Sequence, residues 1–122
     1  MIPVTQSRVG MLGNCFAACL ASLLGCGLAA IPEFSDDDEI FAEQLQCFLL
    51  TQNKFYIELK PEDEMLETIF KYGMTFHIVE GTSPRGGRHA CVGLNGEIIH
   101  DPHPGGTGLT TVEVFGFLGD RL

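Results

Sequence analysis

The segment CFAACLASLLG, at residues 15–25, constrains the fold more than any other part of the chain. Wound into a helix, it carries apolar or small side chains on every side. Such a helix is stable only where other elements cover most of its surface. Asn14 is a good N-cap residue and Gly25 a good terminator, so the sequence predicts a helix over residues 15–25. The remaining chain must supply the covering surface.

That surface is expected to come mainly from strands further along the chain. Expected strands lie at residues 55–59, 74–80, 88–94, 97–101 and 109–118. Two more helices are expected, one at residues 35–53 that opens at Ser35 and one at residues 61–73 that opens at Pro61. Helices come first and strands follow, which predicts an α+β fold with the buried N-terminal helix packed against a C-terminal antiparallel sheet. A chain of 122 residues fits a single domain over residues 1–122.

The charge and hydropathy of the chain limit its partners. With 16 acidic and 7 basic residues the net charge is −9, which argues against nucleic acid as a partner because phosphate binding needs a basic patch. The apolar run at residues 11–30 is short and interrupted by glycine, so no membrane span is expected. LLGC at residues 23–26 resembles a lipoprotein cleavage site, but only Arg8 precedes the run and a signal peptide needs a charged start.

The 5 cysteines include no CxxC pair, so their spacing is not that of a zinc ribbon. We expect a reduced, cytoplasmic protein without structural disulfides. Cys19 and Cys91 are interpreted as packing residues, and Cys26 and Cys47 as inert. His77, inside an apolar strand pattern, is interpreted as a structural histidine.

Cys15 differs from the other cysteines because it stands in the first turn of the expected helix. The positive end of the helix dipole is expected to lower the pKa of its thiol, and the thiolate is the nucleophilic form. A nucleophilic cysteine also needs a base, usually histidine, and the base needs an acceptor that fixes its orientation. His89 starts one expected strand and Asp101 ends its hairpin partner, so these two residues are the candidates.

The turn between these two strands decides whether His89 and Asp101 can meet. A two-residue turn at Asn95-Gly96 sends the two side chains to opposite faces, because side chains alternate along a strand. A three-residue turn with Gly96 in a bulge puts them opposite each other on one face. The catalytic interpretation therefore requires the bulged turn or an equivalent register.

The stretches GNCFAACLASLLG and RHACVGLNGEIIHDP resemble the core of papain-like cysteine peptidases, most of all the small bacterial double-glycine peptidase-like domains. GTSPRGGRHACV and HDPHPGGTGL are also similar to stretches of small phage and bacterial proteins. The resemblance covers both ends of the chain and leaves residues 30–70 unassigned. It implies a papain-like fold in which Cys15 is the nucleophile, His89 the base and Asp101 the orienting acceptor.

The resemblance also implies a donor to the oxyanion that forms during the reaction. Gln6 would fill this role, nine residues upstream of Cys15. Asn14 is the fallback donor, together with the backbone N–H of Cys15. The chain has Asn-Cys-Phe where family members usually have Cys-Gly.

The function implied is a thiol hydrolase that acts on peptide, isopeptide or amide bonds of a peptide or protein substrate. The reaction would pass through an acyl-enzyme and need no cofactor. The loop SPRGG at residues 83–87 is expected either to wall the substrate cleft, with Arg85 or Arg88 contacting a carboxylate, or to be a plain connector.

Two other functions stay open. The first is a non-catalytic phage or bacterial protein on the same fold that binds and blocks a partner. The second is a small zinc-binding module in which His100 and His103 of the HDPH motif join His89 and Cys91.

Overall fold

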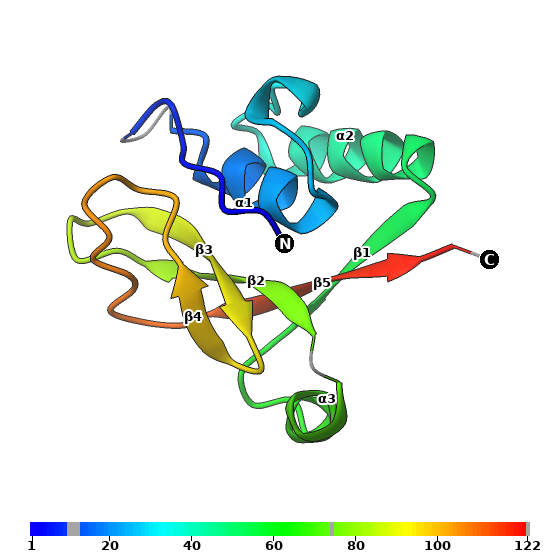
Figure 1. Ribbon diagram of the computed structural model, residues 1–122, viewed down its shortest axis with the longest axis vertical. Helices are drawn as coiled ribbons and strands as arrows, with labels where there is room; N and C mark the ends of the chain where they lie inside the picture. Colours follow the sequence, from blue (N-terminus) through cyan, green and yellow to red (C-terminus); the bar gives the residue numbers. More distant parts are fainter. Residues whose placement is uncertain (10–12, 74, 122) are drawn as a thin grey trace.

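The computed structural model describes residues 1–9, 13–73 and 75–121, which form helices and one five-stranded antiparallel sheet (Figure 1). The helices are α1 (Cys15–Leu24), the 3-10 helix η1 (Leu28–Ala30), α2 (Asp38–Thr51) and α3 (Met65–Tyr72). The strands are β1 (Lys54–Leu59), β2 (Phe76–Thr82), β3 (Arg88–Leu94), β4 (Glu97–His100) and β5 (Val114–Asp120). The predicted α+β class is confirmed. Within the described ranges, no helix is long and apolar enough to cross a membrane.

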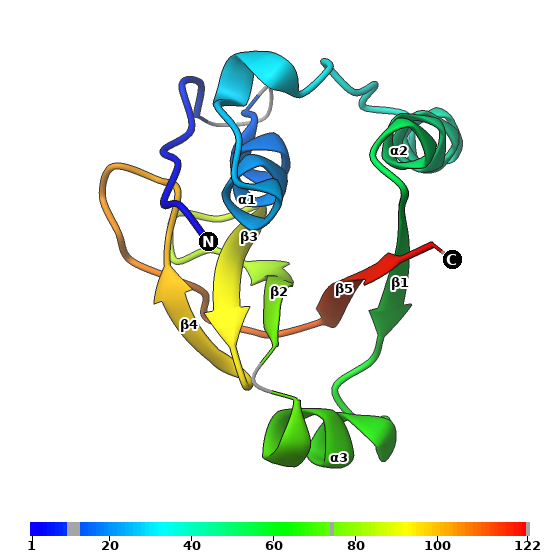
Figure 2. The same ribbon diagram turned by 45° about the vertical axis from the view of Figure 1, so that its right-hand side comes forward.

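The last strand of the chain lies inside the sheet. The strand order is β1-β5-β2-β3-β4, so β5 pairs with β1 on one side and with β2 on the other (Figure 2). The hairpin of β3 and β4 forms the opposite edge. All of these pairs are antiparallel, as the sequence predicts.

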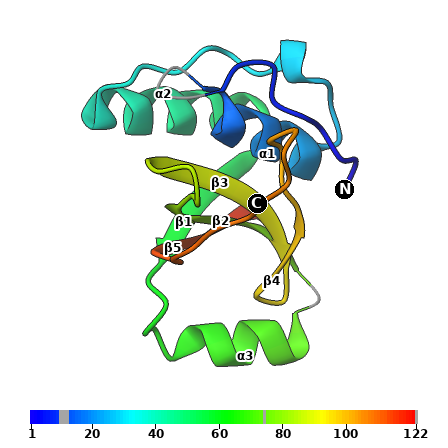
Figure 3. The same ribbon diagram turned by 90° about the vertical axis from the view of Figure 1, so that its left-hand side faces the viewer.

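Helices cover both faces of the sheet, with α1 and α2 on one side and α3 on the other (Figure 3). Because side chains alternate along a strand, Ile78 of β2 packs on the α1 side and its neighbour Val79 on the α3 side. The core on the α1 side contains Cys19, Leu20, Ala21, Ile31, Leu45, Leu49, Tyr56, Ile78, Ala90 and Val92. The core on the α3 side contains Leu66, Val79, Phe115 and Phe117.

Helix α1 forms where the sequence predicts it, and Gly25 ends it with a φ of 72°, a left-handed conformation that glycine adopts without strain. Asn14 holds the N-cap position, but its side chain does not cap the helix. Its Oδ1 instead accepts hydrogen bonds from the N–H groups of Ser7 and Arg8, each at 3.0 Å. Asn14 thereby ties the N-terminal arm to the start of α1.

The other predicted boundaries shift by a few residues. Helix α2 starts at Asp38 and not at Ser35, because the carboxylate of Asp37 caps the backbone there. Helix α3 starts at Met65 and not at Pro61, because a turn comes first.

Strand β5 begins at Val114, later than the predicted start at residue 109. Residues 109–113 instead cross the end of β2 in close backbone contact. Gly81 of β2 makes this crossing feasible, because a Cβ at that position would lie 1.8 Å from the carbonyl oxygen of Thr111.

The β3–β4 turn has two residues, Asn95 at φ 51° and Gly96 at φ 88°, so of the two alternatives the three-residue turn does not form. The register nevertheless shifts inside the hairpin, because Ile99 of β4 has no partner across the ladder. This bulge moves every later residue of β4 to the other face. His89 and Asp101 therefore share one face through an equivalent register.

Candidate active site

A buried imidazole–carboxylate pair forms the centre of the site. His89 Nε2 lies 2.7 Å from Asp101 Oδ1, and the side chains are 5% and 6% exposed. Burial alone would raise the pKa of Asp101, but the bond from His89 and the N–H groups of His103 and Gly108 lower it. Asp101 is thus held as an ionised acceptor, and its bond fixes the proton of His89 on Nε2.

The loop after β4 is folded around the same carboxylate. The N–H of His103 donates to Asp101 Oδ1 at 2.9 Å, and the N–H of Gly108 donates to Oδ2 at 2.7 Å. Gly108 has a φ of 72°, which favours glycine at this point. The DPHPGGTG segment therefore serves to fix the orientation of Asp101.

Cys15, the predicted nucleophile, lies in the first turn of α1 and is partly buried. It lines a cavity of about 680 Å³ that His89 also lines. No hydrogen bond joins Cys15 to His89 in the described part of the chain. Contacts between catalytic groups are often longer in an unliganded site than in the reacting complex. The structure thus brings His89 and Asp101 into direct contact and places Cys15 on the wall of the cavity that His89 lines.

The pKa of the Cys15 thiol differs from the predicted direction. Burial raises it, although the backbone N–H groups of Ala90 and Phe16 act to lower it. The prediction that the helix start lowers this pKa is wrong in its net direction, because desolvation of the thiolate outweighs the backbone dipoles. Cys15 is therefore mainly a thiol at neutral pH when no substrate is bound.

Of the two oxyanion candidates, only Gln6 lines the cavity shared by Cys15 and His89. Gln6 is 7% exposed, and its Nε2 donates to the carbonyl oxygen of Arg8 at 2.6 Å. The backbone N–H of Gln6 also donates to the carbonyl oxygen of Pro102 at 2.9 Å, which fastens the arm to the loop after β4. Asn14 lines a different cavity, and its side chain is bonded to the N-terminal arm.

Both arginines expected near the substrate line the cavity as well. Arg88 forms ion pairs with Glu113 at 2.5 Å and Glu80 at 3.9 Å. Arg85 donates to the hydroxyl of Thr107 and has no carboxylate partner among the described residues. The loop at residues 83–87 is therefore a wall of the cavity.

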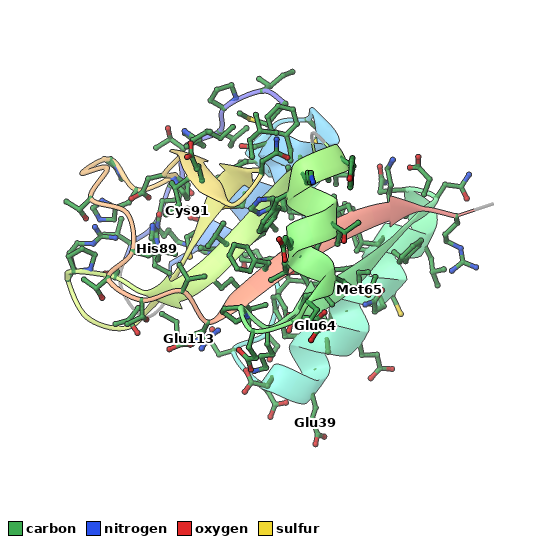
Figure 4. The ribbon with its side chains drawn as sticks, turned by 90° about the horizontal axis from the view of Figure 1, so that it is seen from below. Glu39, Glu64, Met65, His89, Cys91 and Glu113 are labelled. Carbon is green, nitrogen blue, oxygen red and sulfur yellow. The ribbon has the colours of Figure 1, made fainter. Side chains whose placement is uncertain are left out.

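Cys91, interpreted as a packing residue from the sequence, is fully buried and lies beside the His89–Asp101 pair. Its sulfur and the nearest ligand atoms of His89 and Asp101 all lie within 4.8 Å of one another. Figure 4 shows Cys91 and His89 close together on β3. Burial raises the pKa of Cys91 to about 12, with Asp101 adding to the rise. The signal in the sequence is the two-residue spacing, which places both side chains on one face of the strand.

The HDPH motif does not gather its two imidazoles. His100 Nε2 donates to the carbonyl oxygen of Val4 at 2.7 Å, and His103 Nδ1 accepts from the N–H of Gly105 at 2.8 Å. In the described ranges, the group whose ligand atoms lie close enough for a metal contains His89, Cys91 and Asp101 but neither motif histidine. The zinc site expected as an alternative is therefore not assembled from these residues.

No protein family model, curated protein or solved structure matches the chain. The resemblance to papain-like cysteine peptidases accordingly stays an expectation.

Proposed function

We propose that the protein is a thiol hydrolase of papain-like organisation that cleaves a peptide, isopeptide or amide bond through an acyl-enzyme on Cys15. One observation carries the proposal: the imidazole of His89, bonded to buried Asp101 at 2.7 Å, lines the same cavity as Cys15, which lies at the start of a helix. A nucleophile, a base and a group that orients the base are the elements of such a site.

His89 acts as the base through Nδ1, because its Nε2–H is committed to Asp101. Cys15 is protonated before substrate binds, since burial raises its pKa. His89 Nδ1 therefore accepts the thiol proton as the sulfur attacks the carbonyl carbon, and no ion pair needs to exist beforehand. The S–C bond forms, the C–N bond breaks, and the leaving nitrogen takes the proton from the imidazolium. Water then hydrolyses the thioester and returns the proton to Cys15.

Gln6 and the backbone supply the stabilisation of the oxyanion. Side chain Nε2 of Gln6 carries two hydrogens, and the bond to Arg8 uses one of them. The N–H of Cys15 has no helical partner because it lies in the first turn of α1. A carbonyl oxygen that becomes negative between these two donors would be stabilised by both.

Acylation by a neutral activated ester, such as p-nitrophenyl acetate, tests the proposal. The protein is quenched in acid and digested, and the acetyl group is located by mass spectrometry. We expect acetyl on Cys15, turnover that Cys15→Ser abolishes, and acylation slowed roughly 100-fold or more by His89→Ala. Cys47→Ser is the matched control, because Cys47 is an exposed thiol on α2. Acetylation of Cys47 without Cys15, or wild-type turnover by Cys15→Ser, would overturn the proposal.

A second candidate is a non-catalytic binding protein on the same fold. The raised pKa of Cys15 and the missing bond to His89 favour it, because neither activates the thiol. The ester experiment separates the two candidates. If the protein only binds a partner, Cys15 should stay unacylated both in the wild type and in His89→Ala.

A further inference from the structure

Two cavities meet at Cys15, and it is the one residue of the described chain that lines both. The first, of about 620 Å³, is lined by a group of apolar side chains together with Asp36 and the paired Arg8 and Glu33, and is here called the apolar cavity. Its main apolar residues are Phe16, Leu28, Ile31, Pro32, Phe34 and Phe41. The second, of about 680 Å³, also holds His89, His103, Arg85 and Arg88 and is called the cationic cavity. A substrate bound at the sulfur of Cys15 thus meets a group of apolar side chains on one side and two arginines on the other.

The positive charge of the cationic cavity is concentrated in Arg85. The guanidinium of Arg88 is already paired with Glu113 and Glu80. Arg85 contacts only the neutral hydroxyl of Thr107 and forms no ion pair within the described ranges. A guanidinium binds a carboxylate through two parallel N–H donors. Arg85 therefore leaves a positive charge on the cavity wall that is free to bind an anionic group.

The position of His89 decides which part of the substrate enters which cavity. His89 lines the cationic cavity and not the apolar one. The same imidazole must deliver its proton to the leaving nitrogen, because the base that activates the nucleophile becomes the acid. The leaving group therefore lies in the cationic cavity, and the acyl group in the apolar cavity.

We propose that the substrate is a peptide whose leaving portion ends in a free carboxylate bound by Arg85, and whose acyl portion places an apolar side chain in the apolar cavity. This proposal rests on the proposed function. The cationic cavity has the volume of a small-ligand site, so the leaving portion is an amino acid or short peptide. The step forms the Cys15 thioester, breaks the C–N bond and releases an amine that keeps its carboxylate.

Alkylation by iodoacetate and iodoacetamide tests the anion site without any turnover. The two reagents differ by a carboxylate, so the ratio of their rates at one thiol measures attraction for an anion. Each thiol is followed by mass spectrometry, and exposed Cys47 is the internal reference. Variant Arg85→Gln is compared with Lys71→Gln, which removes the same charge from α3 on the far face of the sheet.

We expect a higher iodoacetate-to-iodoacetamide ratio at Cys15 than at Cys47, and a roughly two- to fivefold loss of it in Arg85→Gln but not in Lys71→Gln. Equal ratios at the two cysteines, or equal effects of the two variants, would overturn the anion site. Because both reagents alkylate a thiol directly, this outcome is independent of whether the neutral ester acylates Cys15.

Three peptides then identify the source of the carboxylate. They share one acyl portion and carry a leaving portion with a free C-terminus, an amidated C-terminus, or an amidated C-terminus beside a glutamate. We expect kcat/KM to be highest for the free C-terminus, and the preference to disappear in Arg85→Gln. Preference for the amidated glutamate peptide, or for none of the three, would contradict the C-terminal assignment.

Discussion

The carboxylate of Asp101 accepts a hydrogen bond from the imidazole of His89 at 2.7 Å, although a turn of two residues alone would place the two side chains on opposite faces of the hairpin. The bulge at Ile99 restores their common face. The pair therefore depends on one extra residue in an edge strand, and changes at Asp101 are the most direct probe of it.

Asp101→Asn is expected to weaken both the site and the fold. Asp101 accepts from His89 and His103 through Oδ1 and from Gly108 through Oδ2, whereas an amide has one acceptor oxygen. At least one buried donor loses its partner, which costs about 1–3 kcal/mol in the free energy of unfolding measured with urea. The acylation rate should fall roughly 100-fold or more, since the base loses its orientation. Asp120→Asn, at an exposed ion pair with Lys54, should cost less than about 1 kcal/mol.

The stability that Asp101 contributes should disappear in acid. Burial opposes the ionised form, but the bonds from His89, His103 and Gly108 outweigh it and lower the native pKa below that of the unfolded chain. A lowered carboxyl pKa stabilises the native state above the unfolded value, near pH 4, and this contribution is lost as pH falls through the native pKa. The difference in unfolding free energy between wild type and Asp101→Asn should therefore shrink below about pH 4. A difference that stays constant from pH 7 to pH 2.5 would contradict this assignment.

The ionisation of Glu80 should affect the free energy of unfolding in the opposite direction, lowering stability as pH rises. Burial raises its pKa to about 7, with Glu58 and Glu113 adding to the rise and Arg88 opposing it. A raised carboxyl pKa makes the native state bind more protons than the unfolded chain between about pH 4.5 and 7, so stability falls as pH rises through that window. Glu80→Gln should then be more stable than wild type at pH 8, by on the order of 2 kcal/mol, and nearly equal to it at pH 4.

Urea unfolding of both proteins at pH 4 and pH 8 measures this difference. Glu43→Gln is the matched control, because Glu43 is exposed on α2. It should change stability by less than about 0.5 kcal/mol at either pH. If Glu80→Gln were destabilising at pH 8, its pairing with Arg88 would outweigh the cost of burying the charge.

Gly81→Ala tests the crossing of residues 109–113 over β2. The added Cβ would lie 1.8 Å from the carbonyl oxygen of Thr111, and backbone must move to make room. Overpacking of this kind costs about 1–3 kcal/mol. Gly27→Ala is the control, because no atom lies within 4 Å of the new Cβ and its φ of −78° suits alanine. Thermal unfolding should separate the two variants clearly, and equal midpoints would mean that the crossing is not tight.

Local patterns predict much of this fold. The apolar run before Gly25 specifies α1, and the Asn95-Gly96 pair specifies the β3–β4 hairpin. Both are short-range signals in which side chain and backbone preference agree. The grouping of Cys15, His89 and Asp101 can be hypothesised from their chemistry and their positions at element ends, on the condition that a bulge corrects the alternation.

Features that depend on distant partners could not be predicted. The bulge at Ile99 carries no residue typical of bulges, so alternation alone gives the wrong face for Asp101. Asn14 is suited to cap a helix, yet its side chain accepts hydrogen bonds from the N-terminal arm instead. The upward pKa shift of Cys15 arises from burial under elements far along the chain, which outweighs the local dipole of α1.

During synthesis, β1 and β2 leave the ribosome well before β5, which pairs with both of them and lies between them in the sheet. A nascent chain that ends before residue 114 exposes two unpaired strand edges, and such edges invite association with other chains. Folding must wait for this nonlocal closure, which slows it. C-terminal truncations that remove β5 should therefore accumulate as aggregates.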